Sequence, residues 1–372
     1  MMDYVFYFNW VLLIIFQILI IYDFYRFSHN KRAINNLISL SILIVVYAFL
    51  MYLLLRMREN ITIASFILPL WLLVLNISIL CLFLIVLIST FASILYKKYF
   101  DTSETRIHSF ILKKQNKIRN ASKLKRDSLR KLNHALLFCA MLVFFIVFGL
   151  LLKPFPEFFN FVFNSESNSL YLFSNFIVKT IDVESFLINL GGLRSIFYIF
   201  FYIFLLLMLF NEISRKSKLY KCPFNFLANM VLSEEEIKEY GSYLYFAVGH
   251  IFASLFCPPI ILYAILGMST ISDLASSQVG IRFGRYKIQW NSQKSWEGTI
   301  AGTLVCFLLC FLISGPIWSS IFTILFFIID ISTGDPIDVS DNLLIPFTGT
   351  LIYIIMSAFL TISCDSLFLA LI

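Results

Sequence analysis

Long apolar runs recur along this chain of 372 residues and limit its fold more than any other feature. A helix needs about 20 apolar residues to cross a bilayer core of about 30 Å. Runs of that kind predict ten membrane spans, near residues 4–22, 35–55, 63–95, 133–152, 194–213, 242–257, 260–280, 298–314, 317–331 and 343–370. The composition agrees, because 60% of the residues are hydrophobic and 14% are charged, whereas a soluble domain has about 25% charged residues. We therefore expect an all-α, polytopic membrane helix bundle of ten transmembrane helices.

Basic residues predict the orientation of this bundle. The segment from Lys97 to Lys131 holds twelve Lys or Arg and three acidic residues, and such a segment is cytoplasmic by the positive-inside rule. Alternation of the spans then places the basic clusters near residues 26–32, 215–221 and 282–294 on the same side. The basic segment should also contact anionic lipid headgroups. It lacks the interleaved aromatic residues of a nucleic-acid-binding segment, so no nucleic-acid partner is expected.

The sixth to ninth predicted spans differ from the others because they are short or carry polar residues. We expect these four inside the bundle, away from lipid, where neighbouring helices can satisfy polar groups.

Three polar motifs interrupt the apolar pattern, and the predicted orientation puts all three on the cytoplasmic side. The first comprises Arg130, Lys131 and His134 at the start of the fourth span. Spacings of three and four residues put His134 on one helix face with both cations, an arrangement suited to a phosphate group. The alternative is that the two cations anchor the helix end and that His134 is a buried polar residue with a local partner.

The second motif begins at Asp273. An ionised carboxylate in an apolar helix costs at least about 2.5 kcal/mol, so Asp273 should have a cation or a metal ion as its partner. Beyond it the chain combines glycines, which admit a ligand close to the backbone, with cations and with a helix N-terminus, which favours anions. These residues are Gly280, Gly284, Arg285, Lys287, Lys294, Ser295 and Glu297. Together they favour polyphosphate binding; the alternative, an ordinary basic loop, accounts only for the cations.

The third motif is acidic. Asp338 and Asp341 face the same way within one helical turn, and carboxylate oxygens suit Mg²⁺. Asn342 is placed to add a neutral ligand or to orient a phosphate. The alternative is a solvated acidic loop that caps the last helix, and we expect Asp335 in solvent. The chain has neither a Walker loop nor the glycine-rich loop of protein kinases, so a nucleotide would have to be held in another way.

These motifs resemble those of one superfamily. Phosphatidate cytidylyltransferases share a nucleotide loop with the CTP-dependent polyprenol, dolichol, phytol and diacylglycerol kinases. The second motif resembles this loop in the residues Asp273-Leu-Ala275 through Gly280, Phe283-Gly284, Lys287 and Lys294-Ser-Trp-Glu-Gly298. The opening and closing motifs of the kinase branch resemble Arg130-Lys131-x-x-His134 and Asp338-x-x-Asp341-Asn342. The resemblance covers about residues 127–350, with Ser272 where the family has glycine.

The resemblance implies a CTP-dependent lipid kinase that transfers the γ-phosphate of CTP to the hydroxyl of a membrane lipid alcohol, namely a polyprenol or dolichol, a phytol-like alcohol or a diradylglycerol. Asp338 and Asp341 would hold Mg²⁺. Asp273 would act as a further metal ligand or as the catalytic base, and His134 is the alternative base. The implied nucleotide-binding residues are Arg130, Lys131, Gly280, Gly284, Arg285, Lys287, Lys294, Ser295, Glu297, Gly298 and Asn342.

Two other functions stay open. The stretch from Lys294 to Gly298 also resembles the cytidylyltransferase form, which makes a CDP-lipid from CTP. Buried carboxylates are also typical of transporters, so a non-catalytic transporter or scaffold is the third hypothesis. The predicted domains are a three-helix membrane extension over residues 1–96, a basic cytoplasmic linker over 97–126 and a catalytic membrane domain over 127–372, with its active site on the cytoplasmic face.

Overall fold

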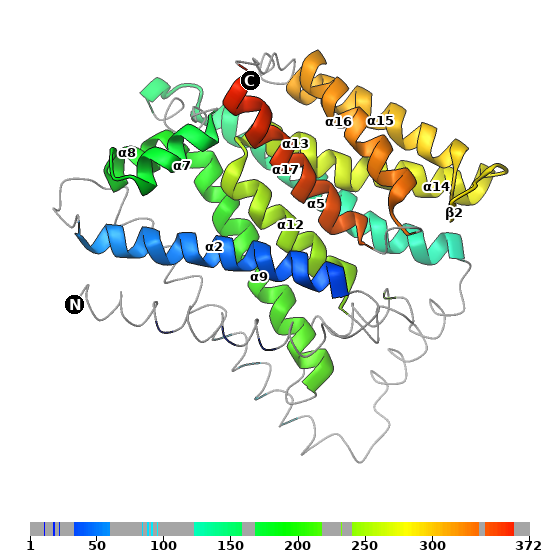
Figure 1. Cartoon of the computed structure of the whole chain (residues 1–372), viewed down its shortest axis with the longest axis horizontal. Helices are drawn as coiled ribbons and strands as arrows, with labels where there is room; N and C mark the ends of the chain where they lie inside the picture. The colour runs from blue at the N-terminus through cyan, green and yellow to red at the C-terminus, as the bar shows by residue number, and fades with distance from the viewer. Residues whose placement is uncertain are drawn as a thin grey trace.

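The structure of the chain, a computed structural model, describes residues 33–59, 123–157, 168–217, 240–334 and 339–360, with a few single positions elsewhere. These parts form a helical bundle with one short β-hairpin (Figure 1). Its long or apolar helices are α2 (Ala33–Glu59), α5 (Lys123–Leu152), α9 (Gly192–Ser217), α12 (Ser242–Phe256), α13 (Pro259–Gly267), α14 (Asp273–Phe283), α15 (Trp296–Ser314), α16 (Pro316–Ser332) and α17 (Asp341–Phe359). A π-helical turn, Met268–Ser272, joins α13 to α14.

The predicted all-α class is confirmed for the described residues. Within the described residues, six helical stretches are long and apolar enough to cross a membrane, and α12 and α16 are shorter apolar helices. Each of these eight coincides with a predicted span. The predicted spans at residues 4–22 and 63–95 lie outside the described residues, so the count of ten stays a prediction.

Two short helices lie in the segment between α5 and α9. In α7 (Ser169–Ile177) the side chain of Asn168 accepts a hydrogen bond from the Tyr171 amide at 3.0 Å, and Asp182 caps α8 (Val183–Leu190) in the same way. Such caps satisfy amides at a helix start that lack a partner within the helix. Phe176 of α7 and Phe186 of α8 stack at 4.1 Å between ring centroids, so the two helices pack through one apolar face.

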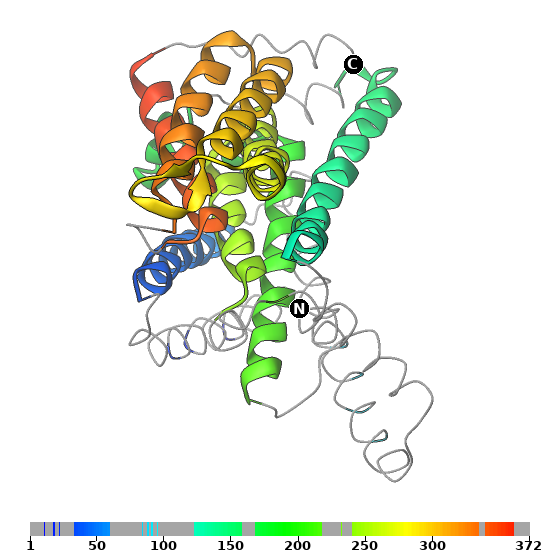
Figure 2. The ribbon, with the colours of Figure 1, turned by 90° about the vertical axis from the view of Figure 1, so that its right-hand side faces the viewer.

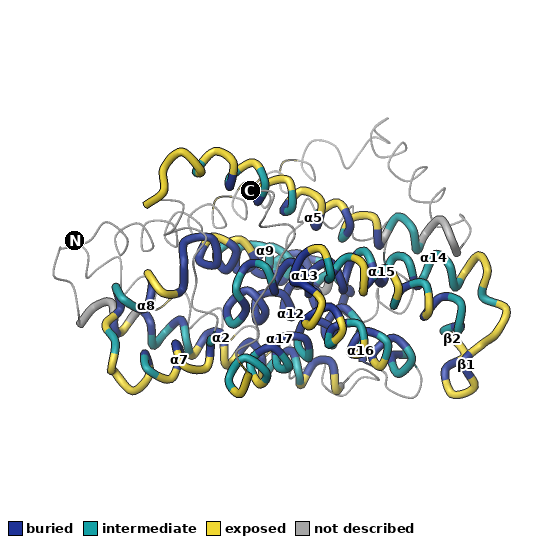
Figure 3. Tube along the Cα trace, turned by 90° about the horizontal axis from the view of Figure 1, so that it is seen from above, coloured by how far each residue is buried: buried dark blue, intermediate teal, exposed yellow. Residues whose placement is uncertain are grey.

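The centre of the bundle is formed by α12 and α13, which are buried along nearly their whole length (Figure 3). Helices α17, α9 and α2 pack around α12, while α15 packs on α13 and α14. Helix α5 stands at the edge of the bundle (Figure 2) and exposes one long side. Burial of α12 and α13 confirms the interior position predicted for the sixth and seventh spans.

The same prediction is wrong for the eighth and ninth spans. Helix α15 exposes Leu304 and Leu308, and α16 exposes Ile324 and Ile328. The polar residues of these two helices, among them Thr299 and Asp330, are buried on their opposite faces. Each of these two helices therefore turns its polar face to the core and leaves its apolar face exposed, where lipid can contact it.

Helix α2 belongs to this core although it comes from the predicted extension. Its residues Val46, Tyr47 and Leu50 are buried, and Asn36 accepts a 2.8 Å hydrogen bond from Tyr245 of α12. The predicted division into extension, linker and catalytic domain stays a prediction, but the described part of the extension packs directly on the predicted catalytic domain.

Candidate functional site

The π-helical turn before Asp273 marks the first part of the candidate site. Such turns are rare and occur frequently at functional sites, because they shift the following side chains out of the regular helical sequence of faces. Immediately after the turn, Asp273 accepts a hydrogen bond from the ammonium of Lys131 at 2.7 Å, and the Asp273 carbonyl oxygen accepts a second at 3.1 Å. Both side chains are buried. Asp273 therefore has the cationic partner that its position in an apolar helix predicted, and that partner is Lys131.

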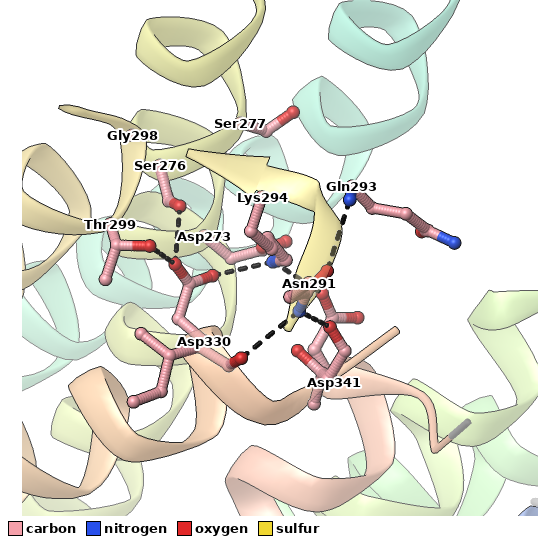
Figure 4. Close-up of polar contacts among 12 residues, drawn as sticks. Asp273, Ser276, Ser277, Asn291, Gln293, Lys294, Gly298, Thr299, Asp330 and Asp341 are labelled. Atoms are coloured by element: carbon pink, nitrogen blue, oxygen red, sulfur yellow. Dashed lines mark hydrogen bonds and ion pairs between the residues drawn. The ribbon is translucent and has the colours of Figure 1, made fainter. Parts of the chain in front are cut away.

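A second ion-pair cluster surrounds Lys294 (Figure 4). Its ammonium lies 2.6 Å from Asp330 Oδ1 and 3.9 Å from Asp341 Oδ2. The other oxygen of Asp330 accepts hydrogen bonds from Ser276 at 3.0 Å and Thr299 at 2.6 Å. Asp330 thus joins side chains from α14, β2 and α15 to its own helix, α16.

Asp330 is the residue of this cluster that the sequence analysis missed. A signal was present, because Asp330 is an ionisable residue within the apolar run 317–331, and the rule applied to Asp273 applies to it equally. Asp330 lies outside the three polar motifs.

The charge on Lys294 is stabilised by these acids. Burial by itself lowers the pKa of Lys294, but the charges of Asp330, Asp341 and Asp273 outweigh that effect and raise the pKa above its ordinary value. About a fifth of the Lys294 side chain is exposed, so the ammonium has a path to solvent. Lys294 is accordingly a permanent cation at the edge of the cluster.

Glycines bring α14 and α15 into close contact beneath this cluster. A Cβ atom on Gly298 would lie 2.6 Å from the Ser276 carbonyl oxygen and 2.9 Å from the Gly280 Cα, closer than side-chain carbons pack in proteins. A Cβ on Gly284 would collide with Ser295. The predicted glycines therefore allow helix and loop packing, and their contact with a nucleotide stays a prediction.

The loop after α14 is held by its own polar contacts. It contains a hairpin of β1 (Lys287–Ile288) and β2 (Asn291–Ser295), which pair antiparallel. The Glu297 carboxylate accepts hydrogen bonds from the backbone amides of Arg285 at 2.9 Å and Tyr286 at 3.1 Å. Ser295 is the N-cap of α15 and accepts a bond from the Gly298 amide at 3.3 Å.

An open pocket of about 400 Å³ lies at this loop, lined by Arg282, Phe283, Gly284, Arg285 and Glu297. The Arg285 side chain, which lines the pocket, is exposed, and so is the Lys287 side chain in β1. These positions leave both cations available to an anionic ligand.

The remaining predicted residues are divided between described and undescribed parts. His134 stacks on Phe246 of α12 with ring centroids 4.4 Å apart. The backbone amide of Asn342 donates a hydrogen bond to Asp341 Oδ1 at 2.9 Å. The Arg130 side chain and Asp338, together with Asp335, lie outside what the structure describes. The predicted pair of metal ligands, Asp338 and Asp341, is therefore seen only in part.

Among the described residues, no group of three or more His, Cys, Asp or Glu side chains is close enough together to hold a metal ion. Lys131 and Lys294 instead occupy oxygens of Asp273, Asp330 and Asp341. What the structure brings together is thus a group of two ammonium and three carboxylate groups, drawn from α5, α14, β2, α16 and α17. Lys131, Asp273 and Asp330 are buried in it, while Lys294 and Asp341 are partly exposed.

No family model, no curated protein and no solved structure matches this chain.

Proposed function

We propose that this protein is a CTP-dependent lipid kinase that transfers the γ-phosphate of CTP to the hydroxyl of a membrane lipid alcohol. The observation that carries the proposal is the convergence of Lys131, Asp273, Lys294, Asp330 and Asp341 at one end of a membrane bundle. Burying charges is costly, and a well-packed apolar cluster of the same volume is often at least as stable. A cluster of this kind therefore favours a chemical role over a purely structural one.

The charges suit phosphoryl transfer, in which most of the catalysis is positioning and electrostatic stabilisation. Lys294, with the exposed Arg285, would bind the polyphosphate of CTP through charge-assisted hydrogen bonds. The alcohol must lose its proton as its oxygen attacks the γ-phosphorus, and CDP leaves with the electrons of the broken bond. Asp273 is the proposed acceptor of that proton, with His134 as the alternative.

Mg²⁺ is the proposed cofactor, because carboxylate oxygens are hard ligands. Asp341 is the described residue proposed to hold the ion, with Asp273 as a further ligand and Asp338 as its predicted partner. When bound, Mg²⁺ would neutralise charge on the transferring phosphate. The Lys294 ammonium supplies further positive charge beside Asp341.

The test is transfer of label by the purified full chain in lipid nanodiscs, with a polyprenol, phytol and a diradylglycerol as acceptors. We expect label from the γ-phosphate of CTP in the lipid product, and none from the α-phosphate. ATP and GTP serve as controls for the nucleotide. A product labelled only from the α-phosphate would replace the kinase proposal with cytidylyl transfer.

Cytidylyl transfer is kept as the second candidate because of Lys131. An acceptor that already carries a phosphate needs extra positive charge, and Lys131 is an ammonium within the cluster. A phosphatidate acceptor in the same assay tests this candidate. Binding of Mg-CTP without any lipid product would favour the transporter or scaffold hypothesis instead.

A further inference from the structure

The start of α2 contacts the segment that carries Asp341. Asn35, in the first turn of α2, accepts a 2.8 Å hydrogen bond from the backbone amide of Ser340. Asn35 is completely buried. A residue more than 300 positions earlier in the chain thus holds the backbone directly before a proposed metal ligand.

This bond acts where α17 begins. Ser340 is the N-cap of α17, and its own side chain makes no capping hydrogen bond. Its carbonyl oxygen accepts the amides of Leu343 and Leu344, each at 3.0 Å. The orientation of the Asp341 side chain at the first position of α17 therefore depends on the position of the Ser340 backbone. Asn35 fixes that backbone through a hydrogen bond from outside the helix.

The position of Asp341 in turn matters for Lys294. Asp341 directs one carboxylate oxygen to the Asn342 amide at 2.9 Å and the other to the Lys294 ammonium at 3.9 Å. A small shift of the helix start would change the second distance, and electrostatic energy varies inversely with distance. Asn35, Ser340, Asp341 and Lys294 thus form one connected path from α2 into the cluster.

Burial of the Asn35 side chain is also energetically unfavourable in part. Its Nδ2 is buried and has no hydrogen-bond partner in the described structure, and a buried polar group left unsatisfied is unfavourable. An apolar side chain would avoid that cost but would leave the Ser340 amide without its acceptor. The side-chain amide of Asn35 is therefore explained by its hydrogen bond with Ser340 and not by packing in the core.

We infer that Asn35 is a positioning residue for Asp341, so that helix α2 completes the candidate site. The catalytic part of this inference rests on the proposed function; the structural part does not. It makes the region before residue 96 necessary for full activity, although every predicted site residue follows residue 126.

The neighbouring residue provides a matched control. Asn36 is also buried and its Oδ1 accepts a 2.8 Å hydrogen bond, but the donor is Tyr245 of α12. Asn36→Ala removes a buried hydrogen bond from the same helix turn without altering the bond to Ser340. The two alanine variants should therefore lose similar thermal stability.

The first measurement is hydrogen exchange of the amides in residues 341–345, which requires no activity. Asn35→Ala should exchange about fivefold faster there than wild type, since loss of one hydrogen bond is worth about 1 kcal/mol, while Asn36→Ala should exchange like wild type. The second measurement is turnover of CTP. Asn35→Ala should lower kcat about fivefold or more and raise the Mg²⁺ concentration needed for half-maximal activity, whereas Asn36→Ala should do neither.

Ser340→Pro removes the donor of the same bond, and Ser340 already has φ −68°, close to the value that proline fixes. In a double-mutant cycle, adding Ser340→Pro to Asn35→Ala should cause little further loss of kcat or protection. Additive losses, or equal exchange in Asn35→Ala and wild type, would overturn the inference. If wild type makes no lipid product but the exchange difference is found, the proposed function fails and the structural role of Asn35 stands.

Discussion

At the scale of single residues, Asp330 holds the candidate site together. Its two oxygens accept three hydrogen bonds, one from Lys294 and two from hydroxyl groups. These bonds use three of the roughly four acceptor sites of the carboxylate, so little capacity is left for substrate. We therefore assign Asp330 to positioning Lys294, and Lys294 to binding phosphate.

Replacing Asp330 by asparagine tests this assignment. The variant should lose about 1.5 to 3 kcal/mol of stability, the usual worth of a charged hydrogen bond, and CTP turnover should fall tenfold or more. Asp330→Asn combined with Lys294→Met should recover much of the stability, because the ammonium that has lost its nearest carboxylate is removed, but not the turnover. Thermal unfolding and kcat/KM for CTP check both parts. Full turnover in the double variant would show that Lys294 has no role in substrate binding.

The raised pKa of Lys294 gives a prediction for pH dependence. A lysine whose pKa is higher in the folded state stabilises the fold fully below its ordinary value of 10.5 and loses that effect only as pH rises through the folded value. The stability difference between wild type and Lys294→Met should therefore be constant from about pH 8 to about pH 9, above the range in which the partner carboxylates take up protons. Thermal unfolding of both proteins across this range is the measurement. A difference that disappears within the range would contradict the assigned ion pairs.

At the scale of elements, the site depends on two helix contacts. Helix α5 meets α14 along a polar row in which Lys131 pairs with Asp273, Ser128 with Gln278 and Ser277 with Asp127. Helix α14 meets α15 through Gly280 and Gly298. The first contact supplies a cation, and the second brings Ser276 and Thr299 to the same oxygen of Asp330.

Gly298→Val tests the second contact. Its side chain would collide with the backbone of α14, so α14 and α15 should separate; overpacking of this kind costs about 1 to 3 kcal/mol. Because Ser276 and Thr299 then lose their common partner, CTP turnover should fall more than tenfold. Leu304→Val, at an exposed position of α15, is the control and should change neither stability nor turnover appreciably. Normal turnover in Gly298→Val would show that this close packing is not needed for the site.

At the scale of the whole molecule, the described helices alternate between two ends of the bundle. The charged cluster lies at the end where α17 begins, and α7 and α8 lie at the end where α9 begins, near α2 residue Tyr52, which donates to the Ile177 carbonyl. The basic residues predict that the first end faces the cytoplasm.

Cysteine labelling tests this orientation. With the native cysteines replaced, Lys287→Cys in the hairpin and Thr180→Cys between α7 and α8 occupy exposed positions. A membrane-impermeant maleimide should label Thr180→Cys in intact cells and Lys287→Cys only after the membrane is opened. The reverse pattern would place the candidate site on the outer face, away from cytoplasmic CTP.

The sequence by itself determined the eight long or apolar helices that coincide with predicted spans and the need of Asp273 for a cation, because both follow from the transfer energies of side chains near in sequence. It did not determine which cation, since Lys131 and Lys294 were equally available by composition. That choice depended on α5 packing against α14, as the role of Gly298 depended on α15 approaching the same helix. The sequence marks Asp330 as an ionisable residue in an apolar run, but it identifies neither the partners of Asp330 nor those of Asn35. Distances between segments far apart in the chain are set by packing, and only the tertiary structure brings α2, α16 and α17 to one site.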